Sequence, residues 1–172
     1  MAGSGARVSG TKRSGADADK RVVATNRQAR RNFEILDTFE AGIVLRGSEV
    51  KSLREAKVTV SDAYARIIDH EAWVIGLHIT PYSHAGGAFA ELDPERDRKL
   101  LLKRLEIDRI KARVDQDRLT LVPLSLYFKD GRAKLELGLG KGRTGVDKRR
   151  HIATRDAERE AQRDMARARR RE

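Results

Sequence analysis

Histidines and a glycine-rich segment are the parts of this 172-residue chain with the most obvious capacity for chemistry. Histidines bind metals when their spacing brings two or more rings together. The four histidines, His70, His78, His84 and His151, have no such spacing. The chain contains no cysteine, which excludes disulfides, thiolate metal sites and cysteine nucleophiles. We therefore expect no metal site and no catalytic thiol.

The glycines at positions 140, 142 and 145 match the pattern G-x-G-x-x-G. In dinucleotide-binding proteins this pattern lies between a strand and a helix of a βαβ unit. The residues that follow Gly145 contain almost no strand formers, so we interpret 140–145 as a flexible basic hinge. The carboxylates form no evident acid–base pair, and no Ser, His and Asp arrangement is apparent. The sequence predicts no catalytic residue, no cofactor and no enzymatic activity.

Basic charge is concentrated in the two end segments of the chain. The 37 Lys and Arg against 26 Asp and Glu give a net charge of +11. Residues 1–31 and 141–172 each have a net charge of +6, and residues 32–140 have a net charge of −1. Basic arms on a nearly neutral body most often bind a polyanion. Tails that only improve solubility are the alternative, although solubility needs no single-sign bias.

The C-terminal segment contains arginines at a helical i, i+4 spacing, namely Arg155, Arg159, Arg163, Arg167 and Arg171. Ala and Arg favour helix, and Asp–Arg pairs at i, i+3 add about 0.2–0.5 kcal/mol each. The apolar column of this helix consists mainly of alanines, which bury too little surface to dock on a core. We expect a marginal helix that becomes ordered on an anionic partner. A solvated helix without a partner is the alternative.

Hydrophobic periodicity predicts the elements that position these charges. Strands are expected over 33–37, 39–45, 58–69 with a bulge, 73–79, 119–128 and 133–139, with hairpin turns over 69–71 and 129–131. A helix is expected over 48–55 with Ser48 as its N-cap, and one or two helices over 94–114. Exposed rings for base stacking are few, because several of the eight aromatic residues fall at core positions of the strands. This favours recognition of RNA through its phosphates and shape.

These elements predict a mainly β fold, an OB-like closed antiparallel barrel of about six strands with flanking helices. A split α+β sheet with helices on one face is the second choice. We expect a disordered basic arm over 1–21, the RNA-binding barrel with a helical insertion over 22–140, and a basic tail over 141–172. Apolar runs are short and the basic first residues lack an apolar stretch, so we expect a cytoplasmic protein that contacts no membrane.

Several strings resemble the SsrA-binding protein (small protein B) family, the partner of transfer-messenger RNA in trans-translation. They fall in the family's order over residues 22–160, at 24–30, 39–45, 49–54, 79–82, 98–102, 121–124, 126–129, 140–142 and 147–149. The resemblance implies an OB barrel that binds the tRNA-like domain of that RNA at its elbow. It also implies a C-terminal tail that enters the ribosomal decoding site and the empty mRNA channel. DNA is not an expected partner.

Site residues follow from the same resemblance. The RNA-binding residues would be Asn26, Arg27, Arg30, Glu40, Lys51, Arg54, Arg98, Lys99 and Leu101. The tail residues at the decoding site and mRNA channel would be Lys141, Gly142, Arg143, Asp147, Lys148, Arg149, Arg155, Arg159 and Arg163. Two features depart from the family pattern: Val146 replaces a ring before the Asp-Lys-Arg triplet, and Glu95 and Asp97 add acids beside the RNA surface. Two other functions compete with this one: a structural ribosomal protein that binds rRNA, and an RNA-modifying enzyme.

Overall fold

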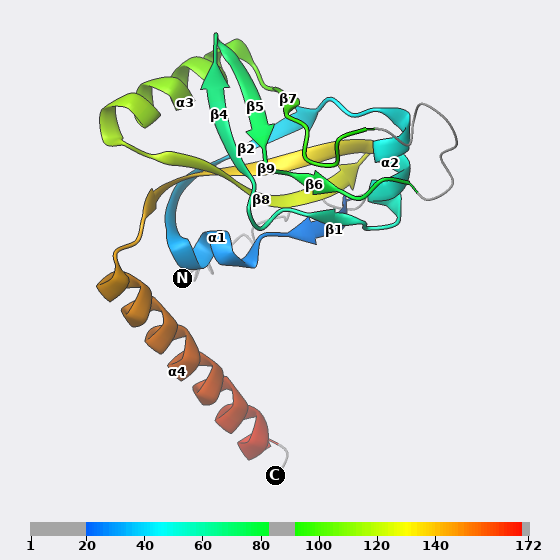
Figure 1. The fold of residues 1–172 in the computed structure, drawn as a ribbon. Coiled ribbons are helices and arrows are strands. Elements are labelled where there is room, and N and C mark those ends of the chain that lie inside the picture. The colour runs from blue at the N-terminus through cyan, green and yellow to red at the C-terminus, as the bar shows by residue number, and fades with distance from the viewer. Residues whose placement is uncertain (1–19, 83–91, 170–172) are drawn as a thin grey trace, which may run out of the picture.

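The computed structural model describes residues 20–82 and 92–169, with the helices and strands shown in Figure 1. In chain order the elements are β1 (Lys20–Thr25), α1 (Arg27–Asn32), β2 (Phe33–Ile43), α2 (Gly47–Arg54), β3 (Val58–Thr59), β4 (Tyr64–Ile68), β5 (Glu71–Ile75), β6 (His78–Ile79), β7 (Arg98–Leu101), α3 (Arg104–Asp117), β8 (Thr120–Lys129), β9 (Arg132–Gly142) and α4 (Gly145–Arg169). Most of the expected N-terminal arm lies outside the described residues. Its expected end at residue 21 is wrong, because Lys20 and Arg21 already belong to β1.

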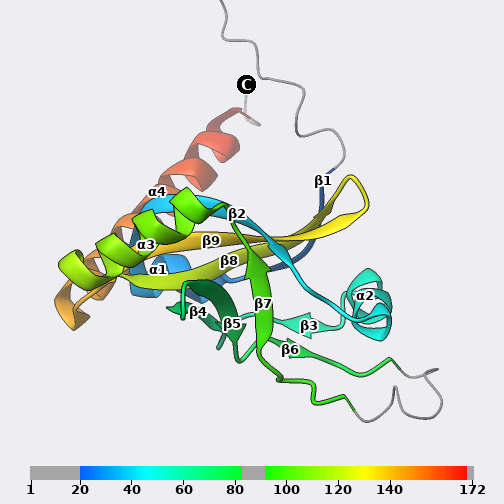
Figure 2. The ribbon, with the colours of Figure 1, turned by 90° about the horizontal axis from the view of Figure 1, so that it is seen from above.

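Six of the strands pair antiparallel into a closed ring, while β3 and β6 form a separate two-stranded sheet. β8 pairs with β9 along one edge and with both β1 and β4 along the other. The remaining pairings, β4–β5, β5–β7, β7–β2 and β2–β9, return to β9, so six strands close on themselves and β1 is added outside. Closure leaves fewer exposed strand edges. The mainly β fold with flanking helices is confirmed, and Figure 2 shows the helices at separate places around the strands rather than on one face.

Alternating aliphatic side chains fill the ring. Ala41, Val74, Leu100 and Leu137 are almost fully buried, and they come from four of its strands. The helix α3 adds Ile110 to this core. A smaller cluster lies beside it, where Ala29 of α1 packs with two residues of β8, Val122 and Leu124.

Two predicted long strands are each interrupted. The segment 58–69 divides into β3 and β4, and the segment 73–79 into β5 and β6. Gly76 marks the second break: its φ is +72°, and a Cβ there would lie 3.2 Å from the Asp62 carbonyl oxygen. The two predicted hairpins are confirmed, since β4 pairs with β5 around Asp69-His70 and β8 with β9 around Asp130-Gly131. In both turns, the two central residues have positive φ, as two-residue hairpin turns require.

The prediction of helix over 94–114 is wrong for the first half of that segment. Residues Arg98–Leu101 form strand β7, in which Arg98 and Leu100 face the interior and Leu101 faces outward. Pairing with β5 and β2 decides this segment, and the helix α3 begins only at Arg104. The leucines at 100–102 fit both the helical period of 3.6 residues and the strand period of two, so the local pattern does not distinguish a helix from a strand here.

Several element ends also differ from the predictions. Arg46, not Ser48, precedes α2, and the Glu49 carboxylate accepts a hydrogen bond of 2.8 Å from the Arg46 backbone N–H. The expected glycine hinge is wrong as well, because Gly140 and Gly142 are paired in β9. A Cβ on Gly140 would lie 2.8 Å from the Glu34 carbonyl oxygen, so the glycine allows two strands to approach closely. The tail helix α4 follows and extends away from the strands (Figure 1).

Candidate nucleic-acid interface

One surface of the ring brings together charged, apolar and aromatic side chains from three strands. We call it the outer face and define it by Glu40 and Gly42 of β2, Lys99 and Leu101 of β7, and Tyr127 and Lys129 of β8. Tyr127 is itself buried, at 2% exposure. The strand register explains the grouping, because residues two apart on a strand share a face. Gly42 pairs with Leu101 of β7, and β9 joins β2 to β8, since Glu40 pairs with Glu136 and Tyr127 pairs with Lys134. Glu40, Lys99 and Leu101, which the sequence placed at an RNA surface, therefore lie on one face.

Glu40 is held ionised at the outer face. The Tyr127 hydroxyl donates a short hydrogen bond to Glu40 Oε2, and Lys129 Nζ lies 3.4 Å from the same oxygen. The hydrogen bond from Tyr127 lowers the pKa of the Glu40 carboxyl, partial burial opposes this effect, and Lys129 adds to the lowering. Lys20 Nζ lies 4.0 Å from the centre of the Tyr127 ring and covers it. Glu40 is thus a fixed acceptor for donors on a ligand.

Replacing Tyr127 by Phe should raise the pKa of Glu40, because it removes the hydrogen bond that stabilises the ionised carboxyl. The ring remains, so packing in β8 changes little. Titration of the Glu40 carboxyl carbon by NMR measures the shift. Tyr64, which is exposed on β4, is the control: Tyr64→Phe should leave the pKa of Glu40 unchanged. An unchanged pKa in Tyr127→Phe would contradict the assigned role of the hydroxyl.

Leu101 is an exposed apolar side chain that a glycine supports. Leu101 is 56% exposed at the end of β7, although β7 lies between β5 and β2. A Cβ on the paired Gly42 would lie 3.2 Å from the Leu101 Cβ, so the glycine leaves room for the leucine to lie across β2. Next to it, Lys99 forms an ion pair of 2.5 Å with Glu71 of β5. The outer face therefore presents an apolar contact flanked by charges of both signs.

Arg98 is not on the surface, which corrects its place in the predicted RNA-binding set. Its side chain is fully buried, and its Nε and Nη2 both lie 2.9 Å from Glu49 Oε1. It also donates to the carbonyl oxygens of Leu77, Pro94 and Arg96, at 2.5, 3.0 and 3.0 Å. Glu49 belongs to α2, Leu77 precedes β6, and Pro94 and Arg96 precede β7. The guanidinium therefore links α2 to the segments before β6 and β7.

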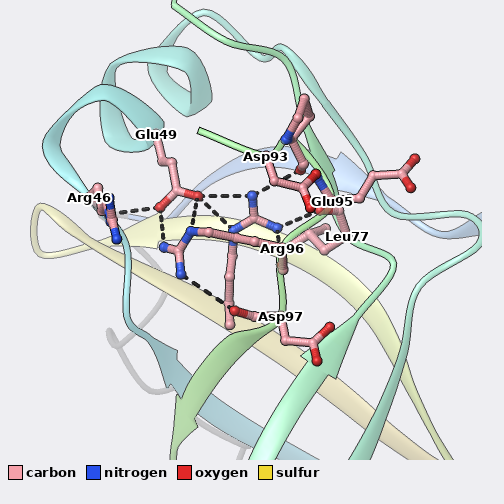
Figure 3. Close-up of polar contacts among 9 residues, drawn as sticks. Arg46, Glu49, Leu77, Asp93, Glu95, Arg96 and Asp97 are labelled. Atoms are coloured by element: carbon pink, nitrogen blue, oxygen red, sulfur yellow. Dashed lines mark hydrogen bonds and ion pairs between the residues drawn. The ribbon is translucent and has the colours of Figure 1, made fainter. Parts of the chain in front are cut away.

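Arg96 completes this cluster from the solvent side. Figure 3 shows its guanidinium facing the Glu49 carboxylate. The two hydrogen bonds between these groups have N···O distances of 3.0 and 2.6 Å. Burial opposes ionisation of Glu49, but hydrogen bonds from Arg96 and the Arg46 amide, together with the charge of Arg98, outweigh it and lower the pKa of this carboxyl. Burial likewise lowers the pKa of Arg98, against the effect of Glu49. The network anchors α2, whose exposed Lys51 and Arg54 were also predicted to bind RNA.

Asn26 is also buried rather than exposed, so its predicted place on the RNA-binding surface is corrected too. Its Oδ1 accepts a hydrogen bond of 3.0 Å from the Ala29 amide and caps α1. Its Nδ2 donates to the carbonyl oxygens of Val60 and Pro123, at 3.2 and 3.1 Å. Asn26 therefore fixes the start of α1, on which the exposed Arg27 and Arg30 lie.

The predicted tail residues occupy two elements. Lys141 and Gly142 end β9, and Arg143 follows, with its backbone N–H 2.8 Å from the Asn32 carbonyl oxygen. The remaining residues lie along α4, namely Asp147, Lys148, Arg149, Arg155, Arg159 and Arg163. The side chains of Asp147 and Lys148 lie outside what the structure describes. The tail residues are thus spread over the end of β9 and the length of α4. Three of them, Arg143, Arg155 and Arg159, line one groove together with Arg27 and Arg30 of α1.

Tyr127, Lys129, Lys20 and Gly42 are outer-face or adjoining residues that the sequence analysis missed as site residues. Glu40 and Tyr127 are 87 positions apart in the sequence, and nothing in either local pattern indicates that they meet. Within 20–82 and 92–169, no group of three His, Asp or Glu could hold a metal ion. No helix in these residues is long and apolar enough to span a membrane.

Comparison with known proteins now identifies the family. A profile of the family described as "SmpB protein" matches residues 23–167. The chain belongs to the SmpB protein family. This match includes both the ring of strands and most of α4, and the SmpB resemblance of the local sequence strings is thereby confirmed.

Relatives within the SmpB family align over most of their length. An SsrA-binding protein of Oleidesulfovibrio alaskensis is 51% identical over 146 residues, which cover 85% of this chain and 93% of the relative. An SsrA-binding protein of Mycolicibacterium smegmatis is 50% identical over 157 residues, covering 91% and 96%. A solved structure described as "tmRNA-SmpB: a journey to the center of the bacterial ribosome" is 45% identical with a TM-score of 0.60, covering 75% of this chain and 93% of the other.

Proposed function

We propose that this SmpB protein binds the tRNA-like domain of transfer-messenger RNA and delivers that RNA to stalled ribosomes in trans-translation. The relatives are named as SsrA-binding proteins, and the similar solved structure is described with transfer-messenger RNA and the ribosome. The single observation from this chain that supports the proposal is the outer face. It gathers an ionised acceptor, two lysines and an exposed leucine on a rigid ring of strands.

The outer face suits recognition of a folded RNA. Glu40 accepts hydrogen bonds from 2′-hydroxyl or base N–H groups, while Lys99 and Lys129 attract phosphates. Leu101 offers an apolar surface to an unstacked base or a ribose. Because these side chains stand on paired strands, their relative positions change little when RNA binds. The protein thus acts by binding, as a cytoplasmic adaptor without a catalytic step.

The C-terminal segment has a separate role in this proposal. Lys141, Arg143 and the arginines of α4 occupy the decoding site and the mRNA channel left empty when a message lacks a stop codon. In support, α4 extends away from the ring and is rich in arginine. A basic helix of this kind can neutralise phosphates of the channel wall. The RNA-binding face and the ribosome-binding tail are therefore different parts of the chain.

Replacing Leu101 by Asp tests the outer face. We expect the Kd for the isolated tRNA-like RNA domain to rise by about 10- to 100-fold, because the change removes a central apolar contact and adds a negative charge beside phosphates. Fluorescence anisotropy of labelled RNA at fixed salt measures the Kd. Leu101 is exposed, so the fold should be retained, and circular dichroism checks this.

Leu105→Asp is the matched control. Leu105 is 83% exposed at the start of α3 and is not part of the outer face. The control introduces the same charge on the same residue type, and its Kd should stay close to that of the unaltered protein. Equal losses of affinity in the two variants would show a general charge effect and would contradict the assignment of RNA binding to the outer face.

A further inference from the structure

A second basic surface lies between α1, the beginning of β2 and the first half of α4. This groove has a volume of about 800 Å³. Arginines from three segments line it: Arg27 and Arg30 of α1, Arg143 between β9 and α4, and Arg155 and Arg159 of α4. It includes none of the six residues that define the outer face, so it is a separate place in the fold.

The charges of this groove are poorly neutralised by the protein itself. Among its described lining residues, five are arginines and one, Glu34, is a carboxylate. Arg159 reaches a carboxylate of its own helix, Asp156, only at 4.0 Å, and both side chains are more than half exposed. Such an exposed pair contributes little. Five arginines around one space repel each other, and an anion in that space would offset the repulsion.

Arg143 gives an independent indication of a missing acceptor. Its Nε is buried and has no hydrogen-bond partner among the described residues. A buried donor without an acceptor is unfavourable, and such atoms are rare. The backbone N–H of Arg143 donates to the Asn32 carbonyl oxygen at the end of α1, so the residue is tied to one wall of the groove. The unpaired Nε thus belongs to an arginine that lines the groove.

The form of the groove favours a chain of phosphates over a single small anion. Arginine pairs with phosphate oxygens through two parallel N–H groups, and here arginines of two helices line one space. Phe33 and Ile35 are half-buried and line the same groove. Their apolar surface suits a ribose or a base between successive phosphates. An isolated phosphate would use one or two of the guanidinium groups and none of this apolar surface.

We propose that this groove, the helix clamp, binds the sugar-phosphate backbone of RNA between α1 and α4, and that the bound strand fixes the direction of α4 relative to the ring. The proposal rests on the proposed function and adds to it a second RNA contact at the root of the tail. The shared chemistry is a phosphodiester chain. Its source is either the tRNA-like RNA or the RNA of the small ribosomal subunit, and the experiment separates the two.

The first experiment compares two pairs of arginines on the same helix. Arg155→Gln with Arg159→Gln removes the α4 side of the clamp. Arg163→Gln with Arg167→Gln lies on the same ribosome-binding tail but outside the groove, and it is the control pair for coupling to α1. Each pair has i, i+4 spacing and includes one arginine near an Asp three positions earlier, at 4.0 and 3.9 Å. Binding to the isolated tRNA-like RNA and to small ribosomal subunits is measured as a function of salt concentration.

The experiment has two readouts. One is the slope of log K against log salt, and the other is whether the effects of the α4 and α1 substitutions add. Removing one arginine–phosphate interaction lowers the slope of log K against log salt by about 0.7–0.9, so the clamp pair should lower it by about 1.4–1.8 for the RNA that occupies the groove. Arg27→Gln with Arg30→Gln removes the other wall. If one strand contacts both walls, the effects of the α1 pair and the clamp pair are non-additive, whereas those of the α1 pair and the control pair add.

A distance measurement tests the effect on α4. The chain has no cysteine, so Gln116→Cys on α3 and Ala161→Cys on α4 introduce two unique sites for spin labels without a change of charge. Both positions are exposed. The distance distribution between the labels should narrow when the RNA that couples to the clamp is added to the full chain. It should stay broad in the Arg155→Gln and Arg159→Gln background.

The outcomes separate this proposal from the proposed function. Additive effects of the two walls with both RNAs, and a distance distribution that RNA leaves unchanged, would overturn the helix clamp. In that case the outer face could still bind the tRNA-like RNA with its dependence on Leu101. Failure of the unaltered chain to bind the tRNA-like RNA would instead overturn the proposed function, and the clamp would stand if the ribosomal subunits showed the coupling.

Discussion

Replacing Arg98 by Met should lower the free energy of unfolding by about 3–5 kcal/mol, because it leaves the Glu49 carboxylate buried without its full counter-charge. The side chains of Arg98 and Glu49 are 0% and 6% exposed, so water cannot replace the interactions that the substitution removes. The change also removes the donors that join the Leu77 and Pro94 carbonyl oxygens. Urea-induced unfolding, followed by circular dichroism, measures the decrease in stability.

The neighbouring residue Lys99 provides a control with a similar ion pair at the surface. Lys99 and Glu71 are 40% and 44% exposed, and exposed pairs contribute about 0–1 kcal/mol. Lys99→Met should therefore change the free energy of unfolding by no more than about 1 kcal/mol. The double variant Glu49→Gln with Arg98→Met should be more stable than the sum of the single effects predicts, because it leaves no unpaired buried charge. Equal decreases in Arg98→Met and Lys99→Met would contradict the assigned role of the buried pair.

Removal of residues 145–172 should abolish ribosome rescue, since it deletes α4 and with it the segment proposed to enter the mRNA channel. The cut after Thr144 follows from the structure. It preserves β9 up to Gly142 and the hydrogen bond of Arg143 with Asn32. The assay measures addition of the tag peptide to chains on ribosomes stalled at the end of a message without a stop codon, in a reconstituted translation system.

The same truncated protein should still bind the tRNA-like RNA, because the strands of the outer face remain. A second variant keeps the helix but replaces Arg155, Arg159 and Arg163 by Gln, which separates the effect of charge from the effect of length. Strong impairment of both variants would support phosphate neutralisation by the tail. Full rescue activity in the truncated protein would contradict a ribosomal role for α4.

Local patterns were sufficient for much of the fold. The alternation of apolar residues predicted the strands around Ala41, Leu121 and Leu137, and the tight turns at Asp69-His70 and Asp130-Gly131 were visible as breaks in it. The i, i+4 arginines predicted the helix α4. These signals are local because each reports the period of one element, and a period of two or of 3.6 residues needs only neighbouring positions to be recognised.

Where a pattern fitted two periods, the partner strands decided. The leucines at 100–102 are compatible with helix and with strand, and pairing of β7 with β5 and β2 selected the strand. The glycine pattern at 140–145 predicts a hinge, whereas the close approach of the Glu34 carbonyl oxygen shows that Gly140 permits contact between two strands. Such choices depend on residues that are distant in the sequence, which no local window contains.

By itself, the sequence determined the distribution of charge, the mainly β class of the core and the helical tail. Composition and periodicity depend only on the residues and their neighbours in the sequence, so they need no knowledge of distant contacts. Only the tertiary structure decided which charged residues are free to meet a ligand. It buried Arg98 against Glu49 and Asn26 at the start of α1. It also brought the Tyr127 hydroxyl into hydrogen-bond contact with the Glu40 carboxylate. Burial and hydrogen-bond partners are properties of the packed chain, and they separate a structural arginine from one that can bind phosphate.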